Sequence, residues 1–342
     1  MLRCRSTVVT DEPTSSASAA SETALITVVV PAYNAAAFIE RTIRSIQGQT
    51  ETRWQCVVVD DGSQDATLDV LQHCVADDHR VTVVRQSNRG ASAARNHGFR
   101  AADPQATWVT FMDADDVWRP HALSTLLAAA EKHDGVGAHG LAELIDEGDA
   151  PIDAGTYANR GRHRLAPKAG VLAPLPLDAP TSFDVLINGN VLFPPGLVLA
   201  RRSAYERVGR FDEALCGGED WDMLIRLSRL GGFAFVDEVI LDYRRHGDNM
   251  GAKAGVAQQA WLVRCLNFWS SDNDAGHKRR AKAGWRAYQS SLRAQRTEAA
   301  REALRGRHLP LAATQAAGAA LCTVRFWCGF PLPRATRDPL PW

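Results

Sequence analysis

Residues 25–30 read Leu-Ile-Thr-Val-Val-Val and form an almost unbroken apolar run that stops at Pro31. A short apolar run rich in β-branched residues is typical of a strand that is buried on both faces of a parallel sheet. Apolar residues at helical spacing follow at positions 38, 39, 43 and 46. The stretch therefore predicts a buried strand followed by a helix, which is the start of a βαβ unit.

The same alternation repeats through the first third of the chain. Apolar runs predict further strands at 55–59, 81–84 and 107–112, and helices are predicted at 68–75 and 90–101. This order predicts an α/β fold with a mostly parallel sheet flanked by helices. Ligands of such sheets bind outside the carboxyl ends of the strands. At those ends the sequence places Pro31, Asp60, Asp61, Asp113 and Asp115.

Composition divides the 342 residues into three regions. Residues 1–23 are rich in Ser, Ala and Thr and are expected to form a disordered leader. Residues 24–250 are expected to form the main domain, with halves at 24–134 and 135–250. Residues 251–342 are predicted to be a helical, basic C-terminal appendage.

The second half of the main domain is less regular. Residues 146–185 lose the strand and helix pattern and are expected to be a long insertion, which in a compact domain is often functional. Helices are predicted at 203–208 and 219–230, followed by a strand at 233–239. The apolar stretch 309–332 is expected to form an amphipathic hairpin, packed on the body or lying on a membrane surface.

The formal net charge is zero, but it is unevenly distributed. Residues 251–342 hold 15 Lys and Arg against 5 Asp and Glu, a net of +10, which leaves −10 on the rest of the chain. A basic tail favours peripheral contact with an anionic membrane surface or another polyanion, and a merely solvated helical face is an equal alternative. No nucleic-acid partner is expected.

Several features bear on the compartment. The first 22 residues lack the apolar segment of a secretory signal, and no stretch approaches the roughly 20 apolar residues of a membrane span. The seven cysteines are scattered and odd in number, which fits a reducing environment. We therefore expect a cytoplasmic protein, placed at the inner face of the membrane if the basic tail contacts lipid.

A run of carboxylates follows the strand predicted at 107–112. Asp113 and Asp115 are two residues apart, so in an extended segment both can point to the same side. Two carboxylates at a strand end suit a hard divalent cation that keeps positions open for phosphate oxygens. Asp116 also follows, so the carboxylate that binds the metal stays open by one residue.

Three other segments carry chemistry. The turn at Asp60–Ser63 offers Asp61 as an acceptor for the imide N–H of uracil or thymine, although Asp-Gly is also ordinary turn chemistry. Residues 89–98 begin a helix with small residues and two arginines, which suits either phosphate binding or close helix packing. Residues 217–222 place acids after two glycines, where a general base or simple helix-dipole stabilisation would fit.

The ordered set of motifs resembles the inverting family 2 glycosyltransferases, which have the A-type nucleotide-diphospho-sugar transferase (GT-A) fold. The resemblance covers about residues 25–250, and its motifs are weak singly but specific in this order. They are Val28–Asn34, Val58–Ser63, Arg89–Gly98, Asp113–Asp115, Gly209–Asp212, Glu219–Trp221 and Tyr243–His246.

The resemblance implies roles for individual residues. The half at 24–134 would bind the nucleotide, and the half at 135–250 would bind the acceptor. The residues that would contact the nucleotide part of the donor are Pro31, Tyr33, Asp61, Arg95 and Asp113. Asp115 would ligate Mg²⁺ or Mn²⁺, and His246 would approach the metal or the diphosphate. Asp220 would be the catalytic base, with Glu219 and Trp221 shaping the acceptor site.

The implied reaction transfers a sugar from a UDP- or dTDP-type donor to a hydroxyl of a glycan or lipid-linked acceptor, in polysaccharide, glycolipid or cell-envelope glycan synthesis. Two alternatives remain at this point. A sugar nucleotidyltransferase shares the sheet and the acidic site, but Pro31–Asn34 is a poor substitute for its usual Gly-rich loop. A non-catalytic nucleotide-sugar-binding module would keep the fold without turnover. The sequence alone names neither the sugar nor the acceptor.

Overall fold

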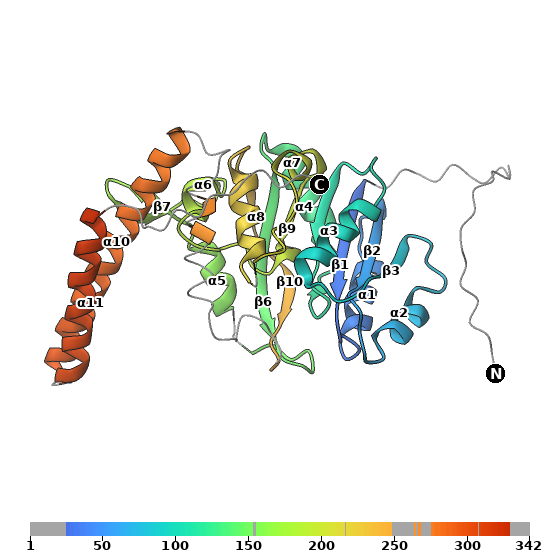
Figure 1. Ribbon diagram of the computed structural model, residues 1–342, viewed down its shortest axis with the longest axis horizontal. Helices are drawn as coiled ribbons and strands as arrows, with labels where there is room; N and C mark the ends of the chain where they lie inside the picture. Colours follow the sequence, from blue (N-terminus) through green and yellow to red (C-terminus); the bar gives the residue numbers. More distant parts are fainter. Residues whose placement is uncertain are drawn as a thin grey trace.

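The computed structural model describes residues 25–152, 155–215, 217–247, 263–264, 266–267, 275–306 and 308–328, with side chains up to residue 321 in the last range. The expected leader at 1–23 lies outside the described residues. The predicted α/β fold is confirmed, because helices alternate with the strands of one large sheet (Figure 1).

Each strand and helix predicted in the first third of the chain is present. The side chains of three of the strands, β1, β2 and β4, are almost all buried, β3 is partly exposed, and the intervening helices bury an apolar face. The elements are β1 (Ile26–Ala32), α1 (Ile39–Gln47), β2 (Trp54–Asp60), α2 (Thr67–Val75), β3 (Val81–Arg85), α3 (Ala91–Ala101) and β4 (Trp108–Phe111).

The second half completes the sheet and adds the insertion. Its elements are β5 (Val117–Trp118), α4 (Ala122–Lys132), β6 (Gly137–Ile145), α5 (Thr156–Arg162), β7 (Leu165–Lys168), β8 (Val171–Pro174), α6 (Phe183–Leu186), η1 (Pro195–Leu197), β9 (Val198–Arg201), α7 (Arg202–Val208), α8 (Glu219–Ser228) and β10 (Phe233–Arg244). Two long helices, α10 (Ala275–Arg305) and α11 (Leu309–Cys328), follow.

One eight-stranded sheet runs through the main domain in the order β3-β2-β1-β4-β9-β6-β10-β5. The pairs β1–β2, β1–β4, β2–β3 and β6–β10 are parallel, and β9 is antiparallel to both of its neighbours. Because β4 and β6 are both antiparallel to β9, they are parallel to each other, and β10 is parallel to β6. The three strands β4, β6 and β10 therefore point the same way. Their carboxyl ends therefore share one edge of the sheet, called here the carboxyl edge.

The first strand runs further than expected. It includes Pro31 and ends at Ala32, and both residues pair with β2. The ladder to β4 has already ended at Val29, so the missing N–H of Pro31 costs no hydrogen bond on that side. The expectation that Pro31 stops the strand is therefore wrong by two residues.

The expected hairpin within 309–332 is also wrong, because the hairpin is formed by two longer helices. Leu309–Cys328 is one continuous helix, α11, and its antiparallel partner is α10. Pro310 is tolerated because it lies in the first turn of α11, where a missing N–H breaks no helical bond. A Cβ at Gly318 would lie 2.0 Å from the Arg296 guanidinium of α10, so this glycine permits close helix packing. No described helix is both long and apolar enough to cross a membrane.

Candidate active site

The structure brings six of the predicted site residues together at the carboxyl edge. The residues come from four places: the start of α3, the loop after β4, the start of α8 and the segment after β10. They are Arg95, Asp113, Asp115, Glu219, Asp220 and His246. Arg95, Glu219 and Asp220 are buried and the other three are half-buried, so their charges interact strongly.

Arg95 links the loop after β4 to the start of α8. Its two terminal nitrogens donate to Asp113 Oδ1 and to Glu219 Oε1, each at 2.8 Å. Burial alone would lower the pKa of the guanidinium, but Asp113 and Glu219 together raise that pKa above its ordinary value. Arg95 is therefore a permanent buried cation that holds two carboxylates from distant parts of the chain.

The small residues of α3 explain how Arg95 reaches this position. A Cβ at Gly98 would lie 2.4 Å from Val29 Cγ1, so the helix packs directly on β1. Ala94 is fully buried against β2. The small residues of the segment at 89–98 thus pack the helix on the sheet. Its Arg95 enters the group of six site residues, which is called here the acidic cluster.

The three carboxylates after β4 have different environments. Asp113 keeps a quarter of its side chain exposed; burial raises its pKa, Arg95 opposes this, and the Asp115 charge adds to it. Asp116 is fully buried, accepts from the backbone N–H of Arg244 at 3.0 Å, and has a pKa raised by burial and by the charges of Asp115 and Asp113. Asp116 therefore supports the loop from within.

Asp115 faces the other way and contacts His246. The Asp115 Oδ2 and His246 Nε2 atoms are 2.8 Å apart, and about a quarter of the Asp115 side chain is exposed. The His246 ring packs on Phe38, with the ring centroids 4.9 Å apart. Of Asp115 and Asp116, Asp115 is thus the one whose carboxylate is accessible to a ligand.

Asp220 lies in the first turn of α8, beside Glu219. Gly217 and Gly218 precede it with φ values of 125° and 75°, a left-handed backbone that side chains other than glycine rarely adopt. Burial raises the pKa of Asp220 to about 7; the Glu219 charge adds to this shift and Arg95 opposes it. Asp220 is therefore a carboxylate that exchanges a proton near neutral pH.

Asp61 lies at the carboxyl end of β2 and is almost fully buried. Its carboxylate accepts from the Gln86 side chain at 2.8 Å and from the backbone N–H groups of Arg89 and Gly90 at 2.9 and 2.8 Å. Two of these bonds go to Oδ1 and one to Oδ2, which leaves acceptor capacity on Oδ2. The bonds also tie the β2 turn to the start of α3.

The remaining predicted residues differ in exposure. Tyr33 is 47% exposed beyond β1, and Pro31 is partly buried within that strand. Trp221 is 5% exposed, and its indole N–H donates to the carbonyl of Leu186 at 2.6 Å. Trp221 therefore packs in the core beneath the site and fixes α8 against α6, so any effect on an acceptor acts through packing.

Comparison with known proteins gives the family. Residues 27–170 match the model of glycosyl transferase family 2. An uncharacterized glycosyltransferase of Nostoc sp. is 32% identical over 242 residues, which are 68% of this chain and 69% of that protein. The chain belongs to glycosyltransferase family 2. The succinoglycan biosynthesis protein ExoO of Rhizobium meliloti is 31% identical over 62% of this chain and 58% of its own length.

Solved structures show the same fold. The structure of S. aureus TarS 1–349 in complex with UDP-GlcNAc matches 86% of this chain and 91% of that chain, with a TM-score of 0.57 and 16% sequence identity. At this identity the match shows the fold alone, and it agrees with the GT-A architecture.

Further residues of this family 2 glycosyltransferase contact or border the acidic cluster. Asn190 donates to Asp220 Oδ2 at 3.2 Å, so it helps to orient the carboxylate. Tyr157 of α5 donates to the carbonyl of Phe193 at 2.9 Å, and its pKa is raised by burial and also by the charges of Asp116 and Asp220. The insertion therefore borders the acidic cluster, a placement for which the sequence gives no local signal.

Arg244 also had an unexpected role. It belongs to the Tyr243–His246 motif but is fully buried. Its side chain donates to the carbonyls of Asp115 and Asp146, each at 2.8 Å, and pairs with Asp149 at 2.6 Å. It holds the carboxylate loop from behind, whereas Arg245 is exposed.

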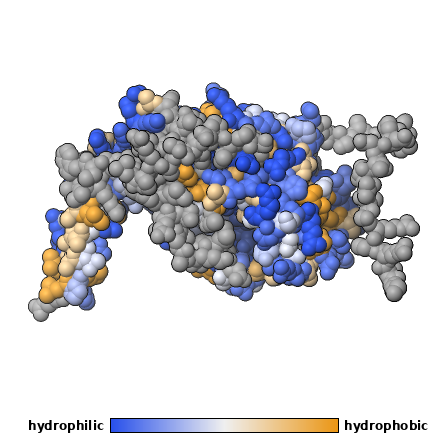
Figure 2. Space-filling model, viewed as in Figure 1, coloured by the Kyte–Doolittle hydropathy of each residue, from blue (hydrophilic) through white to orange (hydrophobic). Residues whose placement is uncertain are grey.

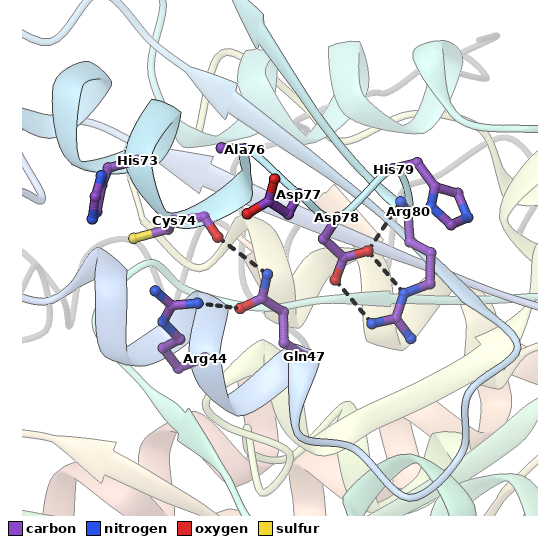
Figure 3. A pocket seen from close by; sticks show the side chains of 9 residues that line it. All are labelled: Arg44, Gln47, His73, Cys74, Ala76, Asp77, Asp78, His79 and Arg80. Atoms are coloured by element: carbon purple, nitrogen blue, oxygen red, sulfur yellow. Dashed lines mark hydrogen bonds and ion pairs between the residues drawn. The ribbon is translucent and has the colours of Figure 1, made fainter.

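A hollow in the glycosyltransferase lies away from this site, at the ends of α1 and α2 and the start of β3 (Figure 3). Its charged groups largely satisfy one another: Arg80 makes two bonds to Asp78, and Arg44 donates to Gln47. The start of β3 is at the opposite edge of the sheet from the carboxyl edge, so this hollow is separate from the acidic cluster.

Proposed function

We propose that this glycosyltransferase moves a sugar from a UDP- or dTDP-type donor to an acceptor hydroxyl with inversion at the anomeric carbon, assisted by Mg²⁺ or Mn²⁺. One observation carries the proposal. A carboxylate with a pKa of about 7, Asp220, lies in the same cluster as Asp113, and its neighbour Glu219 is joined to the loop after β4 through Arg95.

Asp220 is the proposed general base. A base works best when its pKa is near the working pH, because it is then largely deprotonated and still basic enough to accept a proton. The acceptor hydroxyl gives its proton to Asp220 as its oxygen bonds to the anomeric carbon. The bond from that carbon to the diphosphate oxygen breaks on the opposite face, and a single displacement of this kind inverts the centre.

Asp115 and His246 are the proposed metal ligands. Their ligand atoms are 2.8 Å apart, close to the roughly 2.9 Å between adjacent ligands of an octahedral ion with bonds of about 2.05 Å. Among the described residues no group of three or more His, Cys, Asp and Glu could hold a metal alone. A site with only two protein ligands suits Mg²⁺, which is usually bound by one or two carboxylates together with phosphate oxygens and water.

A divalent cation bound there would stabilise the negative charge that grows on the leaving diphosphate. Arg95 contributes in a different way. Its permanent charge pairs with Asp113 and with Glu219, so the loop after β4 and the start of α8 keep their positions relative to each other. Asp113 then faces the donor side, where a ribose hydroxyl can donate to it.

Asp61 is the residue proposed to recognise the base of the donor nucleotide. The acceptor capacity left on Oδ2 suits the imide N–H of uracil or thymine, and a carboxylate cannot serve a base that presents an acceptor there. Pro31 and the exposed Tyr33 would frame the base and ribose. The UDP-GlcNAc complex of TarS supports a uridine donor, because that protein shares the fold.

The acceptor is proposed to be a growing glycan or a lipid-linked sugar. Relatives named for succinoglycan and teichuronic acid biosynthesis support polysaccharide or cell-envelope glycan synthesis. Asn190 bonds to Asp220, and Tyr157 of the insertion is close enough for the Asp220 charge to affect its pKa, so these two residues would contact the acceptor.

The test combines nucleotide binding with turnover. We expect UDP or dTDP with Mn²⁺ to raise the melting temperature, and a UDP- or dTDP-sugar to be consumed with release of the nucleoside diphosphate. Asp220→Asn should lower turnover by about 10²- to 10⁴-fold and leave nucleotide binding near normal. Asp69→Asn, the same change at an exposed acid of α2, is the matched control. Intact turnover in Asp220→Asn, or stabilisation by GDP alone, would contradict the proposal.

The metal ligands have a separate readout. Asp115→Asn should weaken Mn²⁺-dependent binding of UDP by about tenfold or more, measured by calorimetry, because one charged ligand is lost. Binding that is equally tight with and without Mn²⁺ in the native chain would rule out this role. Release of pyrophosphate from a nucleoside triphosphate and a sugar phosphate would instead favour the nucleotidyltransferase alternative.

A further inference from the structure

The helical hairpin of α10 and α11 exposes apolar side chains to solvent. Eight large apolar side chains are exposed among the described residues, and four of them belong to this hairpin: Leu304, Leu309, Leu311 and Leu321, at 55, 65, 52 and 46%. The first three lie within eight residues of one another, around the turn between the helices. Figure 2 shows hydrophobic residues along the hairpin and towards its free end.

The outer helix, α11, also lacks charge over most of its length. Residues 309–321 contain no Asp, Glu, Lys or Arg, and most of them are exposed. Of the described elements, α11 packs chiefly against α10, while α10 packs against β7, β8 and α6 of the insertion and its border. An uncharged helix face on the outside of the molecule is unusual for a surface helix, whose outer face is normally polar.

The inner helix supplies a strong positive charge beside this face. Residues 275–328 hold eleven Lys and Arg against two Asp and Glu, a net of +9. Arg286, Arg293 and Arg301 are exposed along the length of α10. Glu298 pairs with Arg301 at 3.1 Å, but an exposed pair of this kind neutralises little of the total.

We infer that the hairpin lies flat on an anionic membrane surface, with the exposed face of α11 in the interface and the cations of α10 near the lipid phosphates. Helices that bind in this way combine an apolar face with flanking Lys and Arg. A second copy of the chain is a poorer occupant, because two hairpins of net +9 would repel each other. A soluble polyanion would match the charge but would not bury the leucines.

The position of the hairpin fits this orientation. The hairpin stands at one end of the molecule, and its turn lies at the lower end in Figure 1, the side towards which β10 runs. The acidic cluster is at the carboxyl edge, where β10 ends, so the turn of the hairpin and the cluster lie towards the same side of the molecule. The inference does not depend on the proposed donor chemistry, because it concerns only where the protein binds.

The test is co-sedimentation of the full chain with vesicles. We expect binding to mixed phosphatidylglycerol–phosphatidylcholine vesicles and little to phosphatidylcholine alone. Leu304→Ser, Leu309→Ser and Leu311→Ser combined should weaken binding by about tenfold or more. Arg286→Gln and Arg293→Gln should each weaken it by about fivefold and reduce its sensitivity to salt. Val171→Ser with Leu177→Ser, two exposed apolar residues of the insertion, is the matched control.

Each outcome decides the matter. Loss of vesicle binding in the leucine variant, with donor hydrolysis and melting temperature unchanged, supports the inference. Binding that survives the leucine changes and vanishes in salt would show a purely ionic surface and overturn it. Absence of vesicle binding, with a dimer in light scattering that the leucine variant dissociates, would show that a second copy covers this face.

Discussion

The acidic cluster at the carboxyl edge buries charged side chains, whereas the hairpin of α10 and α11 exposes apolar ones. Both are exceptions to the usual distribution of side chains in a folded protein. At the carboxyl edge, charged groups such as Arg95 and Asp220 are buried among apolar strands. On the hairpin, leucines such as Leu309 are exposed beside arginines. Each departure costs folding free energy, since ions prefer water and apolar groups avoid it.

The comparison shows what each region is suited to do. A buried carboxylate keeps a proton near neutral pH, which an exposed aspartate does not, and this makes acid–base chemistry available. An exposed leucine adds nothing to the chemistry but gains free energy when another apolar phase covers it. Substitutions should therefore separate the regions: those at the carboxyl edge should change stability and turnover, and those on the hairpin should change neither.

The largest effect on stability is expected at Arg95. Arg95→Ala should lower the free energy of unfolding by about 3–5 kcal/mol, because Asp113 and Glu219 would remain buried without their shared cation. Urea unfolding monitored by tryptophan fluorescence would measure this. Arg100→Ala, an exposed arginine on the same helix, should change stability by less than about 0.5 kcal/mol. Equal effects would mean that the cluster does not need its cation.

Because of Asp220, turnover should increase with pH while the free energy of unfolding should decrease. Its pKa of about 7 in the folded chain lies well above the ordinary value of an aspartate. Turnover should therefore rise about tenfold per pH unit below pH 7 and level off above it, because the base must be deprotonated. A turnover rate that does not change between pH 5.5 and 8 would exclude Asp220 as the titrating base.

The stability effect of the same residue runs the other way. A raised folded pKa stabilises the fold below the unfolded pKa, and this contribution is lost as the pH rises through about 7. Asp220→Asn removes the buried charge, so at pH 8 it should raise the free energy of unfolding by ~1 kcal/mol or more. The same substitution at pH 4 should be nearly neutral, and a loss of stability at pH 8 would contradict this account.

A moderate effect is expected where α3 packs on β1. Gly98→Ala would place a Cβ 2.4 Å from Val29 Cγ1 and 3.1 Å from Val59 Cγ2, which the core cannot accommodate without movement. We expect a loss of about 1–3 kcal/mol in urea unfolding. Gly189→Ala has nothing within 4 Å of its new Cβ and should be nearly neutral. Equal effects at both sites would show that α3 is loosely packed.

The smallest effect is expected at the exposed end of the hairpin. Leu309→Ser should change the unfolding free energy by less than about 0.5 kcal/mol, because its side chain is 65% exposed and leaves little apolar contact to lose. Differential scanning calorimetry would measure this. A larger loss would mean that the leucine is covered in solution by another part of the chain.

Much of the site could be read from the sequence because its residues follow strand ends. Apolar runs fix the strands, parallel strands bring their carboxyl ends to one edge, and Asp61 and Asp115 therefore had to lie there. Neither the role of Asp116 nor that of Arg244 could be read in this way. Both are charged residues beside functional ones, and only burial distinguishes a supporting ion from a ligand-facing one.

The insertion at 146–185 marks the limit of periodicity as a guide. Its short elements lack a repeating apolar pattern, and nothing local indicates that Tyr157 approaches Asp220. Likewise, periodicity predicted a helical region after 255 but assigned the wrong arms to its hairpin. Helix ends depend on capping and partner packing, and the partner of α11 precedes it in the chain.

By itself, the sequence determined the order of strands and helices, the edge of the sheet that gathers the acids, and the basic character of the C-terminal region, because these follow from the spacing of apolar and charged residues. Only the tertiary structure decided which carboxylate faces outward, that Arg95 joins two distant carboxylates, and that the uncharged face of α11 is on the outside. These properties arise from burial and from contacts between segments up to 131 residues apart, which no local pattern encodes.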